Sequence, residues 1–163
     1  MRHRRIATTA ALVLALALAS CDRDPTGSDV TFIQCGTNDP VAQSATIGPG
    51  GGVLFVDGHS LVLPPGAVRE SVSFTATILA DQYLKVRIQA NGNESWRFDA
   101  PAVLTLSFDQ CDLPGSPDRL RIYKIDPQKN TVISDLGGGR VTGAESVTVL
   151  LDSLSTYTLG MPD

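Results

Sequence analysis

The sequence predicts an all-β protein: a single antiparallel β-sandwich that follows a signal peptide and a flexible tether. Two observations favour this fold class. Apolar and polar residues alternate with a period of two in several short runs, as in strands that pack one face inward. Residues typical of turns separate these runs, and no amphipathic helix pattern follows residue 20. Many short strands with frequent turns indicate an antiparallel sandwich or an open barrel.

The length and composition of the chain limit its class. Its 163 residues suffice for one ordinary domain or two very small ones, and 42% hydrophobic with 18% charged residues exclude a disordered chain. Acidic residues number 17 and basic residues 13, which gives a net charge of −4. Three of the basic residues lie in the first five positions, so the rest carries 17 acidic against 10 basic residues, or −7. Such a surface repels phosphate backbones, and we expect no nucleic-acid partner.

Residues 1–20 have the pattern of an export signal. Three arginines and a histidine among residues 2–5 precede an apolar stretch of 14 residues from Ile6 to Ala19. A helix needs about 20 residues to cross a bilayer core, so this stretch is too short for a membrane span. The pattern therefore predicts a signal peptide over residues 1–20.

A cysteine directly after this signal indicates lipid attachment. Leu18-Ala19-Ser20-Cys21 resembles the lipobox of bacterial lipoproteins, in which the cysteine is acylated by chains such as palmitate and becomes the new N-terminus. The resemblance implies a lipoprotein with Cys21 as its lipidation site. It also implies a place in the cell envelope, anchored to the membrane and facing the periplasm or the cell exterior. The alternative is a conventional signal peptide with an incidental cysteine.

Residues 21–40 are predicted to form the lipidated N-terminus and a flexible tether, because they are rich in Asp, Pro, Gly, Ser and Thr. One apolar patch, Val30 to Ile33, is a candidate extra edge strand.

Once Cys21 is assigned to lipid, Cys35 and Cys111 remain as an even pair in an oxidising compartment, so we expect a disulfide between them. Two unpaired thiols are the alternative. A zinc site is disfavoured, because no Cys-x-x-Cys or histidine pair accompanies them.

Residues 41–163 form the predicted β domain. In the run 71–79, alternate residues from Val72 to Ile78 are apolar and their neighbours are Ser or Thr. Similar alternation occurs at 83–89, 102–108 and 146–151. Residues typical of turns fall between the runs, at 48–52, 64–66, 91–93, 114–115, 126–127 and 137–139.

Three segments carry a more specific pattern: Ile47-Gly48-Pro49-Gly50-Gly51-Gly52-Val53, Asp57-Gly58, and Leu61-Val62-Leu63-Pro64-Pro65-Gly66-Ala67-Val68. Together they resemble the ZU-five domain, a module of zonula occludens proteins, uncoordinated-five netrin receptors, ankyrins and bacterial envelope proteins. The resemblance is good over residues 45–79 and looser over 98–159. It implies a β domain that serves protein contacts. The glycine run is interpreted as a structural turn, because it lacks the Lys-Ser/Thr pair and the helix of a phosphate loop.

Few residues suggest catalysis. His59 is the one histidine after the signal peptide. Together with Asp57 and a serine it could form the catalytic triad of a cryptic hydrolase. No Gly-x-Ser-x-Gly elbow is present, and Asp57-Gly58-His59 fits a hairpin turn. Some eukaryotic ZU-five domains cut themselves at a His-Phe-Ser step; the matching residues, Ser153-Leu154-Ser155, keep the serine but lack the base. We therefore expect no catalytic residues.

Other candidate sites are weaker. Asp109, Asp112 and Asp118 lack the spacing of a calcium loop, so no metal and no cofactor are expected. Aromatic residues for a carbohydrate-binding platform are few: Tyr83, Trp96, Tyr123 and Tyr157. A small basic stripe is expected if two predicted strands are neighbours, and its members are Lys85, Arg87, Arg119 and Arg121.

The function that these patterns favour is that of a lipid-anchored bacterial envelope protein with a non-catalytic β domain for protein interaction or structure. Its expected contacts are the membrane, through the N-terminal lipid, and an envelope protein that the sequence does not identify. A cryptic hydrolase that uses His59 and a carbohydrate-binding module are the two alternatives.

Overall fold

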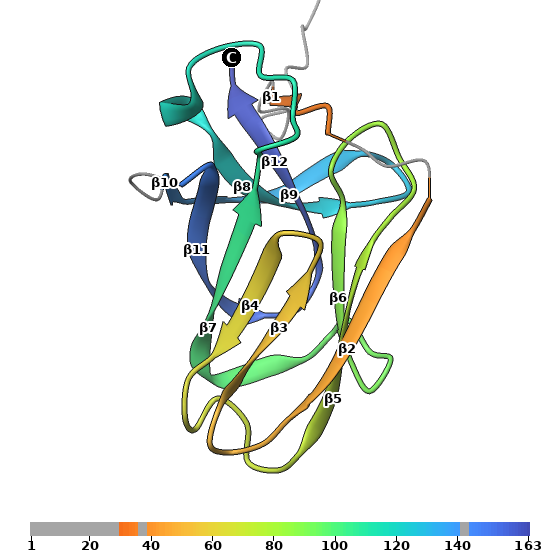
Figure 1. Cartoon of the computed structure of the whole chain (residues 1–163), viewed down its shortest axis with the longest axis vertical. Coiled ribbons are helices and arrows are strands. Elements are labelled where there is room, and N and C mark those ends of the chain that lie inside the picture. The colour runs from red at the N-terminus through yellow and green to blue at the C-terminus, as the bar shows by residue number, and fades with distance from the viewer. Residues whose placement is uncertain (1–29, 36–38, 141–143) are drawn as a thin grey trace, which may run out of the picture.

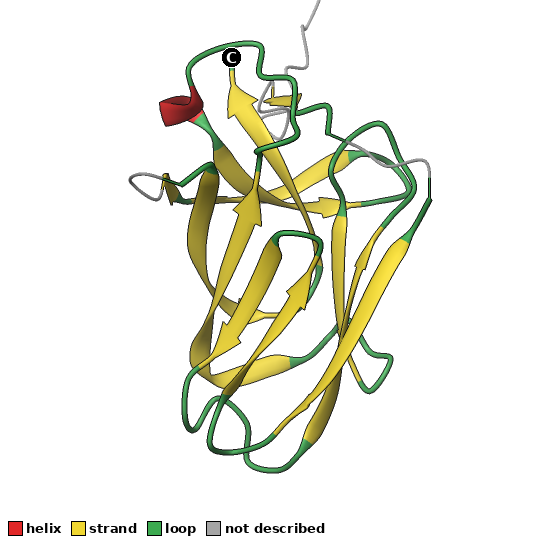
Figure 2. Ribbon diagram, viewed as in Figure 1, coloured by secondary structure: helices red, strands yellow, loops and turns green. Residues whose placement is uncertain are grey.

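The computed structural model describes residues 30–35, 39–140 and 144–163, and it confirms the all-β sandwich. Two antiparallel sheets pack against each other (Figure 1). Within these ranges the one helix is a single 3₁₀ turn, η1 (Pro117–Arg119), shown in red in Figure 2. A search of the same ranges for a helix long and apolar enough to cross a bilayer finds none.

The larger sheet has seven strands in the order β2-β5-β6-β12-β8-β9, and β1 also pairs with β12. Strand β12 pairs with β6 through Thr156 and Tyr157, and with β1 through residues 160–162. The candidate edge strand near the end of the tether therefore exists as β1. The strands of this sheet are β1 (Val30–Phe32), β2 (Val41–Ile47), β5 (Val72–Ile78), β6 (Val86–Ala90), β8 (Arg121–Asp126), β9 (Thr131–Gly137) and β12 (Thr156–Pro162).

The smaller sheet has five strands in the order β10-β11-β7-β4-β3. Its central pair is β7 with β11, which runs in register from Ser146 opposite Ser107 to Leu151 opposite Ala102. The β3–β4 hairpin forms one edge of the sheet, with β3 outermost. The strands are β3 (Gly52–Val56), β4 (His59–Leu63), β7 (Arg97–Ser107), β10 (Gly139–Arg140) and β11 (Ser146–Ser153).

The core lies between the two sheets and consists of the inward members of each alternating run. In β5 these are Val72, Phe74, Ala76 and Ile78, each no more than 3% exposed. The rings of Phe74 and Trp96 meet edge to face with centroids 6.5 Å apart, so Trp96 covers the end of this core. The period-two pattern therefore identified the buried face of this sheet.

The run 83–89 differs in two respects from its predicted form. Strand β6 begins only at Val86, and the side chain of Lys85 is buried, although the alternation predicted that it faces solvent. The Lys85 ammonium lies 2.5 Å from the carboxylate of Asp81, which compensates the cost of burying the charge. Although burial alone raises the pKa of Asp81, hydrogen bonds from Lys85 and from the Tyr83 N–H hold that pKa below its usual value.

One end of the β3–β4 hairpin is a corner built from backbone contacts. The Gly66 N–H donates to the Pro49 carbonyl at 2.8 Å, and the Gly51 N–H donates to the Gly48 carbonyl at 3.0 Å. Gly51 and Gly66 have φ values of 80° and 82°, a region that side chains with a Cβ adopt only at a cost. The glycine and proline segments of the sequence therefore form a structural corner here.

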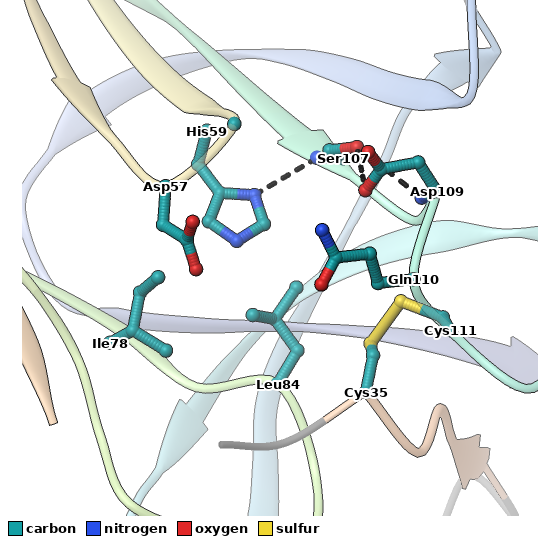
Figure 3. A pocket seen from close by; sticks show the side chains of 10 residues that line it. Cys35, Asp57, His59, Ile78, Leu84, Ser107, Asp109, Gln110 and Cys111 are labelled. Atoms are coloured by element: carbon teal, nitrogen blue, oxygen red, sulfur yellow. Dashed lines mark hydrogen bonds between the residues drawn. A yellow bond between two sulfur atoms is a disulfide. The ribbon is translucent and has the colours of Figure 1, made fainter. Parts of the chain in front are cut away.

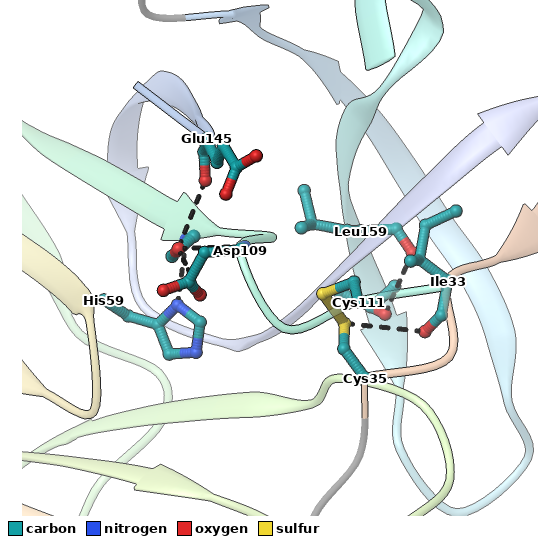
Figure 4. Close-up of a disulfide and its surroundings, with 9 residues drawn as sticks. Ile33, Cys35, His59, Asp109, Cys111, Glu145 and Leu159 are labelled. Atoms are coloured by element: carbon teal, nitrogen blue, oxygen red, sulfur yellow. Dashed lines mark hydrogen bonds between the residues drawn. A yellow bond between two sulfur atoms is a disulfide. The ribbon is translucent and has the colours of Figure 1, made fainter. Parts of the chain in front are cut away.

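Beyond the other end of the hairpin, a disulfide fastens the chain before β2 to the domain. Cys35 and Cys111 are joined, as expected from the cysteine count (Figure 4). Just before Cys35, the Ile33 N–H donates to the Leu159 carbonyl and the Asp112 N–H donates to the Gln34 carbonyl. The domain therefore includes residues 30–35 through a covalent bond and backbone pairing.

Candidate functional site

The turn between β3 and β4 directs His59 into the sandwich. Asp57 and Gly58 both have positive φ, 42° and 80°, which is the geometry of a type I′ hairpin turn. His59 is the first residue of β4 and shares its inward face with Leu61 and Leu63. Alternation along β4 thus places a titratable side chain at a core position near the end of the sheet.

Among the described residues, His59 has one side-chain hydrogen bond, and this bond determines its tautomer. Its Nδ1 accepts the backbone N–H of Ser107 at 3.0 Å, so the ring proton resides on Nε2. The side chain is only 6% exposed, and burial lowers its pKa despite the nearby charges of Asp57 and Asp109. The imidazole is therefore neutral at neutral pH, with an N–H donor opposite the bonded nitrogen.

A cavity of about 520 Å³ opens beside this N–H donor. The Nε2 atom points into the space between Asp57, Gln110 and Leu84 (Figure 3). The lining is mixed: Ile78 and Leu84 are apolar, whereas Asp57, Asp109 and Gln110 are polar. The size is within the range of small-molecule sites in proteins, about 300–1,000 Å³.

The disulfide forms part of the wall of this cavity. Cys35 and Cys111 line it together with Gln110, which immediately precedes Cys111 (Figure 3). The bond therefore keeps the loop after β7, which carries Asp109 and Gln110, close to the segment that enters from β1. The sequence predicted the disulfide and singled out His59, but it contained no signal that Gln110 would lie beside them.

The arrangement around His59 does not have the contacts of a serine hydrolase. Ser107 is the serine that lines the cavity, yet His59 accepts its backbone N–H and not its hydroxyl proton. The Ser107 hydroxyl instead donates to the Asp109 carboxylate at 2.9 Å. A nucleophile needs its hydroxyl within hydrogen-bond reach of the base, so this geometry does not favour the hydrolase hypothesis.

The structure also places the other sequence candidates. Within the described ranges, no three His, Cys, Asp or Glu side chains gather in a way that could hold a metal ion. Tyr123 and Tyr157 are buried, and Trp96 and Tyr83 pack against Phe74 and Phe32. The four aromatic side chains therefore do not form an exposed row, which disfavours the carbohydrate-binding alternative.

The hypothesis of a basic stripe is wrong, because β12 lies between β6 and β8. The four side chains also have local partners. Arg87 pairs with Glu94 at 3.1 Å and Arg121 with Asp135 at 3.0 Å. Lys85 is buried against Asp81, and Arg119 donates to the Pro162 carbonyl.

An apolar patch, which no sequence hypothesis identified, covers the outer face of the smaller sheet. The register places Val53 opposite Val62, Val62 opposite Val103, and Val103 opposite Leu150. This row crosses four adjacent strands, and Phe55 adds a ring two residues from Val53. Phe55 and Leu150 are each 67% exposed. We call the five side chains the outer patch: Val53, Phe55, Val62, Val103 and Leu150.

The outer patch contrasts with the outer face of the larger sheet. There the matching positions of β5 and β6 are Thr75 opposite Gln89 and Thr77 opposite Arg87. Next to the outer patch, the adjoining row is uncharged but polar: Ser60, Thr105 and Thr148 lie opposite one another. A sequence signal for the patch does exist, because residues 53–56 are apolar without alternation and so have apolar side chains on both faces.

Comparison of the chain with protein-family models and with curated proteins finds no match. The ZU-five resemblance and the lipobox resemblance therefore stay predictions. Cys21, the predicted lipidation site, lies outside the described residues.

Proposed function

We propose that this protein is a lipid-anchored component of the bacterial cell envelope, whose β-sandwich binds an envelope protein without catalysing a reaction. The observation that supports this function best is the outer patch, with two side chains that are 67% exposed. Large apolar side chains that gather on one face of a soluble domain are typical of protein interaction sites. The resemblance to the ZU-five domain supports the same proposal, because members of that family serve protein contacts.

The location of the patch suits a flat protein interface. Its row crosses β3, β4, β7 and β11 without a charged side chain, so the row itself holds no ion that a partner would desolvate. The sheet beneath is held by its ladder and by the Thr105–Thr148 hydroxyl contact at 3.0 Å. The surface is therefore preorganised, which reduces the ordering cost of binding.

Site-specific photo-crosslinking in intact cells tests the interaction. A crosslinker at Leu150 should join the protein to one defined envelope protein, whereas a crosslinker at Gln89, on the outer face of the other sheet, should not. Phe55→Ser combined with Leu150→Thr should abolish the adduct of a crosslinker placed at Val62, with no loss of thermal stability. Equal adducts from both sheets, or an adduct that survives this double substitution, would contradict the proposal.

The anchor is tested separately. Cells supplied with a fatty-acid analogue should label the wild-type protein, and Cys21→Ala should remove the label, because the cysteine sulfur is the predicted acyl acceptor. Ser20→Ala, which keeps a small residue before the cysteine, serves as the control and should keep the label. Equal labelling of wild type and Cys21→Ala would overturn the lipid anchor while leaving the outer patch untouched.

A further inference from the structure

We infer that the cavity beside His59 binds a small organic cation that carries a hydrogen-bond acceptor next to its charge, as an amino-acid amide or the N-terminal residue of a peptide does. The cavity holds about 520 Å³ and is lined by carboxylates, a buried imidazole and two apolar side chains. This site is distinct from the outer patch and does not depend on it.

The charge of the ligand follows from the carboxylates. Asp57 and Asp109 both line the cavity, and among the described residues no lysine or arginine does. Neither carboxylate forms an ion pair with another described residue; Asp109 accepts only the Ser107 hydroxyl and Asp57 is exposed. Two unpaired negative charges at the mouth of a concave site favour a cation and repel an anion.

The acceptor on the ligand follows from His59. The side chain is more than nine-tenths buried, its Nδ1 is occupied by the Ser107 N–H, and its Nε2–H has no partner among the described residues. That donor points into the cavity, between Asp57 and Gln110 (Figure 3). This N–H borders the cavity, so it can donate to a ligand carbonyl oxygen that takes the place of water. Burial also lowers the pKa of His59, so the ring does not add a positive charge that would oppose the cation.

The remaining wall indicates the rest of the ligand. Ile78 and Leu84 are both buried and offer an apolar surface to an alkyl side chain. Gln110 is exposed and also lines the cavity, with an amide that can accept or donate. Leucinamide has all three groups: an ammonium, a carbonyl and a branched alkyl chain.

Calorimetric titration of the purified chain with three matched probes tests the site. Leucinamide should bind at a pH where its amine is protonated. N-acetyl-leucinamide, which lacks the charge, and 3-methylbutylamine, which lacks the carbonyl, should each bind about tenfold more weakly or worse, because the first loses the attraction of the carboxylates and the second loses the hydrogen bond from His59. If leucinamide does not bind, or if the three probes bind equally, the inference is overturned.

Substitutions in the wall separate binding from a purely structural role. Asp57→Asn and Asp109→Asn should each weaken the binding of leucinamide. Asp112→Asn, which makes the same charge change just outside the cavity, should not. His59→Asn keeps an acceptor for the Ser107 N–H but removes the ring donor. This substitution should weaken the binding of leucinamide about tenfold and leave the affinity for 3-methylbutylamine unchanged, since that probe has no carbonyl to accept the His59 hydrogen bond. A His59→Asn variant that binds leucinamide as tightly as the wild type would show that His59 is only a core residue.

A fourth probe identifies the source of the ligand. A tripeptide amide that begins with leucine tests whether the cation belongs to a peptide N-terminus. Binding at least as tight as that of leucinamide assigns the site to peptide N-termini, and clearly weaker binding assigns it to free amines. Both results support the cation site, whereas failure of the photo-crosslinking experiment would leave it unaffected.

Discussion

At one end of the β3–β4 hairpin (Figure 1), backbone packs directly on backbone, whereas at the other end polar and apolar side chains line a cavity (Figure 3). At the corner, an added Cβ on Gly51 would lie 2.5 Å from the Leu63 carbonyl oxygen. At the opposite end, the Nε2–H of His59 has no described partner, and a cavity of about 520 Å³ adjoins it.

The difference between the two ends shows where this fold leaves room for a ligand. The corner satisfies its own backbone groups, as the Gly66 N–H does with the Pro49 carbonyl, so nothing there is available for binding. The cavity end carries a donor and two carboxylates without full partners. Four variants test this contrast, from the largest expected effect to the smallest.

The largest effect is expected at the cavity end, from loss of the disulfide. The bond joins residues 76 positions apart, and the chain-entropy model gives a ceiling of about 4.5 kcal/mol for a loop of that size. Cys35→Ser with Cys111→Ser should therefore lower the free energy of unfolding by about 2–4 kcal/mol in denaturant titrations. A double variant as stable as the wild type would show that backbone pairing alone holds residues 30–35. The wild type under reducing conditions is the control.

The next largest effect is expected at the corner. Gly51→Ala combines a positive φ with a Cβ only 2.5 Å from the Leu63 oxygen and 2.9 Å from the Pro64 carbonyl carbon. The conformation costs about 1–2 kcal/mol and the overlap about 1–3 kcal/mol, so we expect a loss of about 3 kcal/mol in the same titrations. Gly50→Ala, where a Cβ has nothing within 4 Å and φ is not positive, is the matched control. Equal stability of the two variants would show that the corner is not tightly packed.

Gly66→Val should have a smaller effect than Gly51→Ala. Gly66 has a φ of 82°, but a Cβ there would meet nothing within 4 Å, so only the backbone conformation opposes the substitution. The cost should be about 1 kcal/mol or somewhat more, because a β-branched residue is especially poor at positive φ. The melting temperature should fall by several degrees, about 4–8 °C per kcal/mol for a domain near 100 residues. A variant that melts like the wild type but loses its crosslinked partner would identify the corner as a binding site.

The smallest effect concerns the pH dependence of stability through His59. Burial holds the pKa of His59 below its usual value of 6.5 in the folded protein. As pH falls through 6.5, the unfolded chain binds a proton that the folded protein does not, so the free energy of unfolding decreases until pH falls below the folded pKa. His59→Asn should remove this component and make the difference in stability between about pH 7.5 and about pH 5 smaller than in the wild type. An unchanged difference would show that His59 titrates in the folded protein as it does when unfolded.

The strands were more predictable than the site. Alternation at 71–79 and 146–151 corresponds to β5 and β11, because a half-buried strand imposes its period on the sequence. Lys85 broke the alternation, since its partner Asp81 comes from the preceding loop and not from a neighbouring strand. The outer patch was missed because its row becomes continuous only through the pairing of Val62 with both Val53 and Val103.

Local chemistry explains what the sequence determined by itself: the all-β class, the turn at Asp57-Gly58, the corner at 64–66 and the pairing of Cys35 with Cys111. Each depends on the backbone preferences of a few adjacent residues or on a small count of cysteines. Only the tertiary structure decided that His59 faces Gln110 and Asp109, which are about fifty positions away in the chain. Strand order and register bring these residues together, and both are set by the packing of two whole sheets rather than by any single segment.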